Sequence, residues 1–179
     1  MTQNIIITGN RHSQKHSNIM EMDPYNSKTA TLLREYDTKN NTSYFKFNEK
    51  TCEKYSKREY EIARMTEPVF SILLYTLNKE ENIKSICLVE YENDLKQLRV
   101  SIDSSNKDII GDVADYAFKN MKMESIIVFV NKNDKNILKE LISNGYTPLF
   151  DDYDSKAQLP FLIEKDVDAY KDERSIICV

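Results

Sequence analysis

Apolar residues recur at helical spacing in two segments before Pro68. The first segment can be capped at Asn26 or Ser27, and the second spans about residues 52–66. Residues 37–49 between them are polar, with a short extended piece predicted at residues 44–47. The chain before residue 68 therefore contributes two surface helices. The inward positions of the first helix are Ala30, Leu32, Leu33 and Tyr36.

After Pro68 the pattern changes to that of β-strands. Residues 69–77 and 83–91 are rich in β-branched, aromatic and other apolar side chains. In residues 95–102 the apolar Leu98 and Val100 alternate with polar neighbours, which is the period of a half-buried strand. Short turns separate the three segments, so we expect an antiparallel meander.

The clearest helical stripe follows the meander. Ser105 and Asp108 stand three residues apart before it, which predicts a capping box with a negative charge at the helix start. Residues 125–130 are then apolar at almost every position, which predicts a strand covered on both faces. A strand, a helix and a buried strand in this order predict a right-handed parallel crossover. The stripe consists of Ile109, Ile110, Val113, Ala114, Ala117, Phe118 and Met121.

A second helix is predicted at residues 134–143, with Asn133 as its cap. Asn144 and Gly145 favour a left-handed stop at its end. Residues 146–150 and 159–165 then read as two strands that close the sheet. Residues 69–165 are thus expected to form the functional half of one α/β domain.

The amino-terminal 23 residues carry little pattern. Residues 5–8 predict a short strand, and residues 9–23 predict an exposed loop. His12 and His16 in that loop have the spacing of two metal ligands on a helix face. No carboxylate or cysteine stands beside them to complete a ligand set, so we expect a solvated loop and no metal site.

Composition narrows the classes of function. The 179 residues fit a single domain over 1–179, divided into 1–67, 68–165 and a tail at 166–179. The formal net charge of -4 argues against a nucleic-acid partner and favours a cationic one. We expect no membrane span, no signal segment and, with three widely spaced cysteines, a reduced cytoplasmic protein.

The order of these elements resembles the GCN5-related N-acetyltransferase (GNAT) superfamily. The resemblance implies an α/β (α+β) acyl-CoA N-acyltransferase-like fold, a mixed central sheet of about seven strands with helices on both faces. In that family a glycine-rich turn before the helix, R-G-x-G-x-G, holds the pyrophosphate of acetyl-CoA with backbone N–H groups. This turn falls on residues 106–111, where only Gly111 remains, Asp108 would repel a phosphate and Ile109 replaces a glycine.

Near the second helix the family has an Asn at the start, a Tyr four residues before the closing glycine, and a Gly-aromatic pair. Gly145 and Tyr146 match the pair, and Leu141 occupies the place of the Tyr that serves as general acid. The resemblance implies acetyl-CoA as cosubstrate and no metal. The implied cofactor-binding residues are Val100, Ser101, Ile102, Asn106, Lys107, Asp108, Ile109, Ile110, Gly111, Asn133 and Asn136.

The family's general base is often a Glu near the third meander strand. Asp94 and Glu92 are nearest to that place, both in a predicted turn, and Glu90 lies one strand period back. Tyr146 and Tyr153 are the alternative acids. The loop with Asp151, Asp152 and Asp154 would border the acceptor and attract a cation such as a polyamine or a lysine side chain, or it is simply solvated.

Two functions stay open from the residues. The first is an acetyl-CoA-dependent N-acyltransferase acting on a primary amine, small or lysine-type. The second is a catalytically silent relative that binds a protein partner, a second copy of itself or an acyl-CoA. The missing glycines and Leu141 favour the second. The intact strand at 98–102, the cap of the following helix and the Gly145-Tyr146 pair favour the first.

Overall fold

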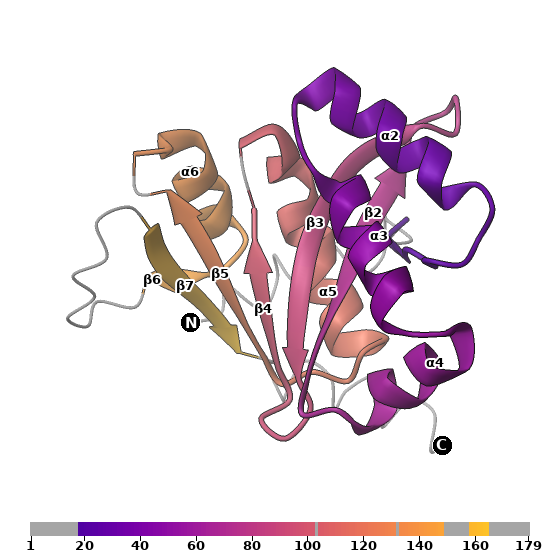
Figure 1. Ribbon diagram of the computed structural model, residues 1–179. Helices are drawn as coiled ribbons and strands as arrows, with labels where there is room; N and C mark the ends of the chain where they lie inside the picture. The colour runs from indigo at the N-terminus through magenta and orange to yellow at the C-terminus, as the bar shows by residue number, and fades with distance from the viewer. Residues whose placement is uncertain (1–17, 103, 132, 149–157, 165–179) are drawn as a thin grey trace, which may run out of the picture.

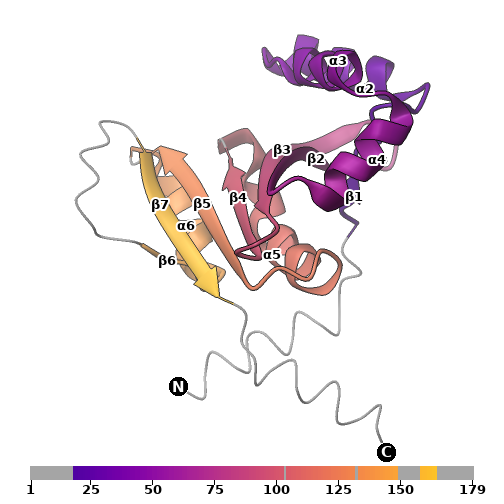
Figure 2. The same cartoon turned by 60° about the horizontal axis from the view of Figure 1, so that its bottom comes forward.

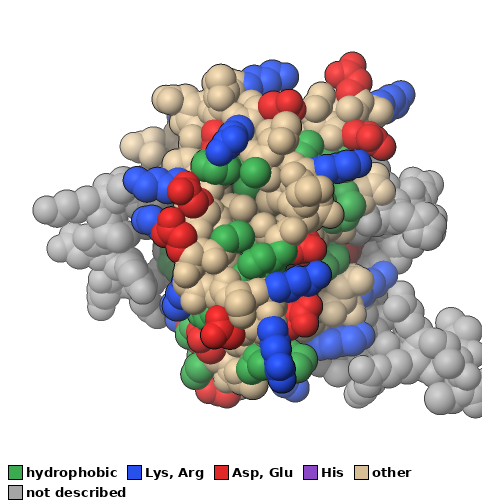
Figure 3. Space-filling view, turned by 45° about the vertical axis from the view of Figure 1, so that its right-hand side comes forward, with side chains coloured by type: hydrophobic (Ala, Val, Ile, Leu, Met, Phe, Trp, Pro, Cys, Tyr) green, Lys and Arg blue, Asp and Glu red, His purple; other side chains and the backbone are tan. Residues whose placement is uncertain are grey.

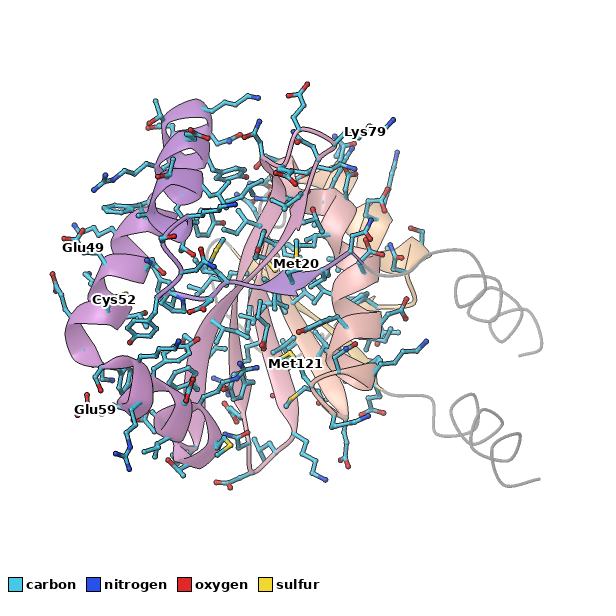
Figure 4. All side chains as sticks on the ribbon, turned by 90° about the vertical axis from the view of Figure 1, so that its right-hand side faces the viewer. Met20, Glu49, Cys52, Glu59, Lys79 and Met121 are labelled. Carbon is cyan, nitrogen blue, oxygen red and sulfur yellow. The ribbon has the colours of Figure 1, made fainter. Side chains whose placement is uncertain are left out.

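The computed structural model describes residues 18–102, 104–131, 133–148 and 158–164, which form a mixed sheet between two layers of helices. Figure 4 views the sheet along its edge at Met20. Glu49, Cys52 and Glu59 point outward from one helical layer, on the far side from Met121. The predicted fold class, a mixed seven-stranded sheet with helices on both faces, is confirmed.

The described strands form one sheet in the order β1-β2-β3-β4-β5-β7-β6. All neighbouring strands are antiparallel except β4 and β5, which are parallel. Both the antiparallel meander and the parallel crossover are therefore confirmed. The strands are β1 (Met20–Glu21), β2 (Val69–Leu77), β3 (Ile83–Glu92), β4 (Gln97–Ser101), β5 (Ser125–Asn131), β6 (Thr147–Pro148) and β7 (Gln158–Glu164).

The helices are divided unequally between the two faces of the sheet. Figures 1 and 2 show α2 and α3 over the β1–β3 half of one face, with α5 and α6 on the opposite face. α4 packs beside the start of β2, where the Tyr60 ring contacts the Phe70 ring. On the first face no described helix lies over β4, β5 and β7, so among the described residues that half is not covered. The helices are α2 (Thr29–Asn40), α3 (Tyr44–Lys54), α4 (Lys57–Thr66), α5 (Ile110–Lys119) and α6 (Lys135–Ser143), and the 3-10 helix η1 (Ser104–Ile109) leads into α5.

The single helix predicted at residues 52–66 is wrong, because two helices meet there. Tyr55 is extended at the end of α3, and Ser56 starts α4 with a capping box. The Ser56 hydroxyl accepts a hydrogen bond from the Glu59 N–H at 3.2 Å, and the Ser56 N–H donates to the Glu59 carboxylate at 2.8 Å. These bonds satisfy two N–H groups at the start of α4, which stabilises the break between α3 and α4.

The extended piece predicted at residues 44–47 is also wrong, because these residues form the first turn of α3. The carboxylate of Asp37 accepts hydrogen bonds from the N–H groups of Tyr44 at 2.9 Å and Phe45 at 2.7 Å. It also accepts one from the Thr42 hydroxyl at 2.6 Å. A side chain in α2 therefore supplies the cap that the local residues do not.

Part of the predicted amino-terminal loop belongs to the sheet. Met20 and Glu21 pair with β2, and the flanking Ile19 and Met22 are buried. Glu21 forms an ion pair with Arg64 of α4, which ties the edge strand to a helix. The predicted strand at 5–8 and the two histidines lie outside the described residues.

The core has two parts, one on each face of the sheet. The larger part lies under α5 and α6 and includes Leu98, Val100 and Val128, and the smaller part lies under α2 and α3. On the opposite face of β4 and β5 the alternation leaves Arg99 and Ser101 exposed and Phe129 half-buried. Polar and apolar groups thus share this half of the sheet face.

Charges of both signs are interspersed over the face seen in Figure 3, with small apolar patches between them. This distribution gives that face no extended field of one sign. No helix within the described ranges is long and apolar enough to cross a membrane.

Candidate functional site

A cleft of about 930 Å³ opens where β4 and β5 end. Its floor is formed by Ser101 and Phe129, which pair with each other across the two parallel strands. Tyr44, the first residue of α3, lines it from the helical layer. A cleft of this volume at the carboxyl ends of adjacent parallel strands is a common place for a small ligand. The other lining residues are Ile102, Asn131, Asn133, Asp134, Lys135, Asn136 and Ile137.

The polar side of the cleft is the connection from β5 to α6. Asn131 accepts a hydrogen bond from the Asn133 N–H at 2.9 Å and so shapes the connection. Asp134 caps α6 by accepting from the Ile137 N–H at 3.3 Å, so the prediction of Asn133 as the cap is wrong. Asn133 and Asn136 both line the cleft.

Asn106, in η1, is completely buried instead of facing outward. Its side-chain oxygen accepts hydrogen bonds from the Ile86 N–H at 2.9 Å and from the Tyr36 hydroxyl at 3.1 Å. β3 extends beyond its pairing with β4, which stops at Leu88 and Ser101. The amide of Asn106 therefore replaces a strand partner on the free edge of β3 and joins η1 to α2.

The predicted capping box at Ser105 and Asp108 is wrong, because both residues lie inside η1. α5 begins only at Ile110, without a side-chain cap. Ile109 and Ile110 are buried in the core, while Gly111 is half-buried in the first turn of α5. In a 3-10 helix each N–H donates to the carbonyl three residues before it, so η1 already engages part of its own amides.

Three charged side chains lie on the same sheet face as the cleft floor. Arg99 of β4 pairs directly with Glu90 of β3, and its guanidinium lies 2.5 Å from Glu92 and 3.9 Å from Glu90. The Glu90 side chain is 44% exposed and that of Glu92 14%. Glu92 ends β3 and is not in a turn as predicted, whereas Asp94 is exposed in the turn. Arg99 holds Glu92 closely and leaves Glu90 accessible.

Comparisons with known proteins show which solved structures share this architecture. No family model and no curated protein matches the sequence. Among solved structures, a mutant form of the spermidine/spermine N-acetyltransferase SpeG from Vibrio cholerae superimposes with a TM-score of 0.55 at 12% identity. The match covers 87% of this chain and 97% of that chain.

A chimeric form of the same Vibrio cholerae enzyme also gives a TM-score of 0.55, at 9% identity over 82% of this chain and 95% of that chain. A dodecameric structure of the enzyme matches with 0.54 at 10% identity, over 83% and 95%. SpeG is a member of the GNAT family. This chain has the GNAT fold.

Two of the three positions considered for a proton donor, Leu141 and Tyr146, lie in the core. Leu141 is fully buried on the inner side of α6. Tyr146 is 2% exposed and its hydroxyl has no hydrogen-bond partner among the described residues. Burial raises the pKa of Tyr146 well above its usual value, so it does not lose its proton near neutral pH. Gly145 before it has a φ of 87°, as the left-handed stop requires.

The unpartnered hydroxyl of Tyr146 leads to a prediction about stability. Tyr146→Phe should leave the free energy of unfolding unchanged or raise it by up to about 1 kcal/mol, because a buried hydroxyl without a partner costs desolvation. Urea unfolding followed by circular dichroism measures this change. Tyr91→Phe is the matched control: the Tyr91 hydroxyl donates to the Arg64 carbonyl at 3.0 Å, and its loss should cost about 1 kcal/mol. Equal destabilisation by both variants would contradict the prediction.

The GNAT cleft brings together only some of the residues predicted from sequence. Ser101, Ile102, Asn133 and Asn136 line it. Val100 is buried beneath the floor, and Lys107 and Asp108 lie in η1. Tyr153 and the acidic loop at 151–154 lie outside the described residues. The lining residues not predicted are Tyr44, Phe129, Asn131, Asp134, Lys135 and Ile137.

Proximity in sequence could have indicated most of the missed residues. Asn131, Asp134 and Lys135 flank predicted sites in the same connection, and Phe129 faces the same side as Ser101 in the neighbouring strand. Tyr44 had no such signal, because its helix was not predicted. No group of three or more metal-ligating side chains occurs in the described part of the chain.

Proposed function

We propose that the chain is an acyl-CoA-dependent N-acyltransferase that transfers an acetyl group from acetyl-CoA to a primary amine. The observation that carries the proposal is the cleft at the ends of β4 and β5, with a carboxylate on the same sheet face. The GNAT fold supports it as a scaffold, while the chemistry has to come from the residues themselves.

The lining of the cleft suits the mixed character of an acyl-CoA. Ile102, Phe129 and Ile137 offer apolar surface to the acyl-pantetheine arm. Asn136 and Lys135, at the start of α6, offer donors to amide and phosphate oxygens. Asn133 belongs to the same proposed contact surface. Asp134 lowers the attraction for an anion, which limits how close the diphosphate can come.

Transfer from a thioester to an amine needs a positioned amine that has lost its proton. We assign the general base to Glu90, which is more exposed than Glu92 and more distant from Arg99. Glu90 lies opposite Arg99, and Ser101 of the cleft floor follows two residues further on the same face of β4. The amine would thus approach along this face of the sheet.

The acceptor is proposed to be a cationic primary amine. Glu90 and Glu92 together carry one more charge than Arg99 neutralises, so this part of the sheet favours a cation. SpeG, to which the chain is similar in fold, is a spermidine N-acetyltransferase. A polyamine or a lysine side chain, met in the cytoplasm, fits this proposal.

A specific observation favours the second function, a catalytically silent acyl-CoA-binding or protein-binding relative. Where the family has a glycine-rich turn, η1 is helical and Asn106 and Ile109 are buried. Binding of acetyl-CoA without turnover would assign the chain to this second function.

Calorimetric titration with acetyl-CoA tests the proposed function. The unmodified protein should bind it, and Ser101→Trp should weaken binding about tenfold or more, because an indole on the floor fills the cleft. Glu53→Trp, exposed on α3, is the control and should bind normally. Thermal melting should rise with acetyl-CoA, since a ligand that binds only the native state stabilises it. No binding at millimolar acetyl-CoA would refute the proposal.

A further inference from the structure

Acyl transfer to an amine expels a thiolate, and that thiolate needs a proton. Leu141 carries no proton to give, and Tyr146 is buried in the core under α5 and α6. Tyr153 lies outside the described residues, so the described candidates for the donor are the side chains that line the cleft. Among the described lining residues, Tyr44 offers a phenol and Lys135 an ammonium group, the kinds of weak acid that can protonate a thiolate.

Tyr44 is held in place from its backbone. The Asp37 carboxylate accepts the Tyr44 N–H at 2.9 Å and the Phe45 N–H at 2.7 Å, which sets the first turn of α3. A residue whose helix start is capped by a preceding helix has little freedom to move away from the cleft.

The Tyr44 ring is also supported from its side. It packs against the ring of Tyr36, with centroids 6.0 Å apart and planes at 57°. The Tyr36 hydroxyl donates to Asn106, which in turn accepts from β3. A chain of contacts thus runs from β3 through Asn106 and Tyr36 to Tyr44, which lines the cleft.

Tyr44 and Glu90 belong to different elements but lie on the same side of the sheet as the cleft floor. Tyr44 of α3 lines the same cleft as Ser101 and Phe129, while Glu90 of β3 pairs with Arg99 two residues before Ser101. A bound thioester over Ser101 would have the phenol on the helical side and the carboxylate on the strand side. Lys135, in contrast, lies at the far side, on the first turn of α6, where the anionic end of an acyl-CoA is proposed to lie.

We propose that Tyr44 is the general acid that protonates the leaving sulfur; this rests on the proposed function. The amine nitrogen attacks the thioester carbon, so a C–N bond forms and the C–S bond breaks. The amine proton passes to the Glu90 carboxylate, and the Tyr44 hydroxyl gives its proton to the sulfur. Tyr44 then regains a proton from solvent, and no oxidant or metal takes part.

Tyr44→Phe is the test, because it keeps the ring that packs on Tyr36 and removes only the hydroxyl. With acetyl-CoA and a panel of spermidine, amino acids and lysine peptides, we expect kcat to fall about 10²- to 10⁴-fold. The dissociation constant for acetyl-CoA should not change. The fall of the wild-type rate at high pH, where the acid is deprotonated, should disappear in the variant. Tyr75→Phe, half-buried in the same cluster, is the matched control and should keep the wild-type kcat.

The outcomes separate this inference from the function on which it rests. If the wild-type protein acylates an amine and Tyr44→Phe keeps both kcat and the high-pH fall, Tyr44 is not the acid while the function stands. If Lys135→Met instead removes the high-pH fall, the acid is Lys135 and the assignment is overturned. If the wild-type protein binds no acetyl-CoA, the proposed function fails, and Tyr44 loses its role with it.

Discussion

Asn106→Leu is expected to lower the free energy of unfolding by about 2–5 kcal/mol. The leucine fills nearly the same volume, but it removes the acceptor used by the Ile86 N–H and by the Tyr36 hydroxyl in a fully buried place. Each donor deprived of a buried acceptor costs about 1–3 kcal/mol. Urea or thermal unfolding measures the loss.

A double-mutant cycle with Tyr36→Phe makes this prediction specific. The single change to phenylalanine removes one donor and should cost about 1 kcal/mol. Once Tyr36 has lost its hydroxyl, Asn106→Leu should cost less than in the wild-type protein, because one of the two orphaned donors is gone. Strict additivity of the two changes would show that the bond between these side chains contributes nothing.

Glu90→Gln is expected to reduce kcat for amine acylation about 10²- to 10⁴-fold, because glutamine keeps the shape of the side chain but cannot accept the amine proton. Acetyl-CoA should still bind, since the carboxylate is not part of the cleft lining. Steady-state rates with spermidine or a lysine peptide, together with calorimetry, measure the two effects separately.

Glu92→Gln is the matched control for the general base. Glu92 sits two residues along the same strand face, but the Arg99 guanidinium holds it at 2.5 Å and its side chain is only 14% exposed. Its replacement should lower kcat much less than the change at Glu90. A larger loss at position 92 would move the base from Glu90 to Glu92.

The strands and helices with a clear hydrophobic period or a clear terminating residue were predicted well from the sequence. The alternation of Leu98 and Val100 and the apolar run at 125–130 indicated the strands that now carry the cleft. Gly145 indicated the end of α6 because no other residue adopts its φ of 87° so easily. Such local preferences agree with the global fold, which is why periodicity sufficed.

Local structure that depends on hydrogen bonds to residues distant in the sequence could not be predicted in this way. Asn106 turns inward because Ile86, 20 residues away, and Tyr36, 70 residues away, both donate to it. That inward turn places η1 where a capping box had been expected from Ser105. In α3 the cap comes from Asp37, seven residues before Tyr44 and in another helix. Among the site residues that were missed, Tyr44 is the one placed by such a bond.

The break between α3 and α4 is a different case. Ser56 and Glu59 have the spacing of a capping box, which can be recognised from the sequence alone. The weak apolar stripe across residues 52–66 concealed it, because Tyr60 and Ala63 continue the same period beyond the break. Local capping chemistry here outweighs periodicity.

The hydrogen bonds within η1 also affect how the salt concentration would change the binding of an anion in the cleft. Amides that already bond within η1 are not available to a diphosphate, so its attraction depends more on the side-chain charges of Lys107 in η1 and Lys135 in α6. Dissolved salt screens charges at a protein surface over about 8 Å at physiological ionic strength, whereas oriented backbone dipoles in a closed turn are screened less. Occupancy of this cleft by acyl-CoA would then follow the ionic strength of its surroundings, a dependence that a glycine-rich turn would have reduced.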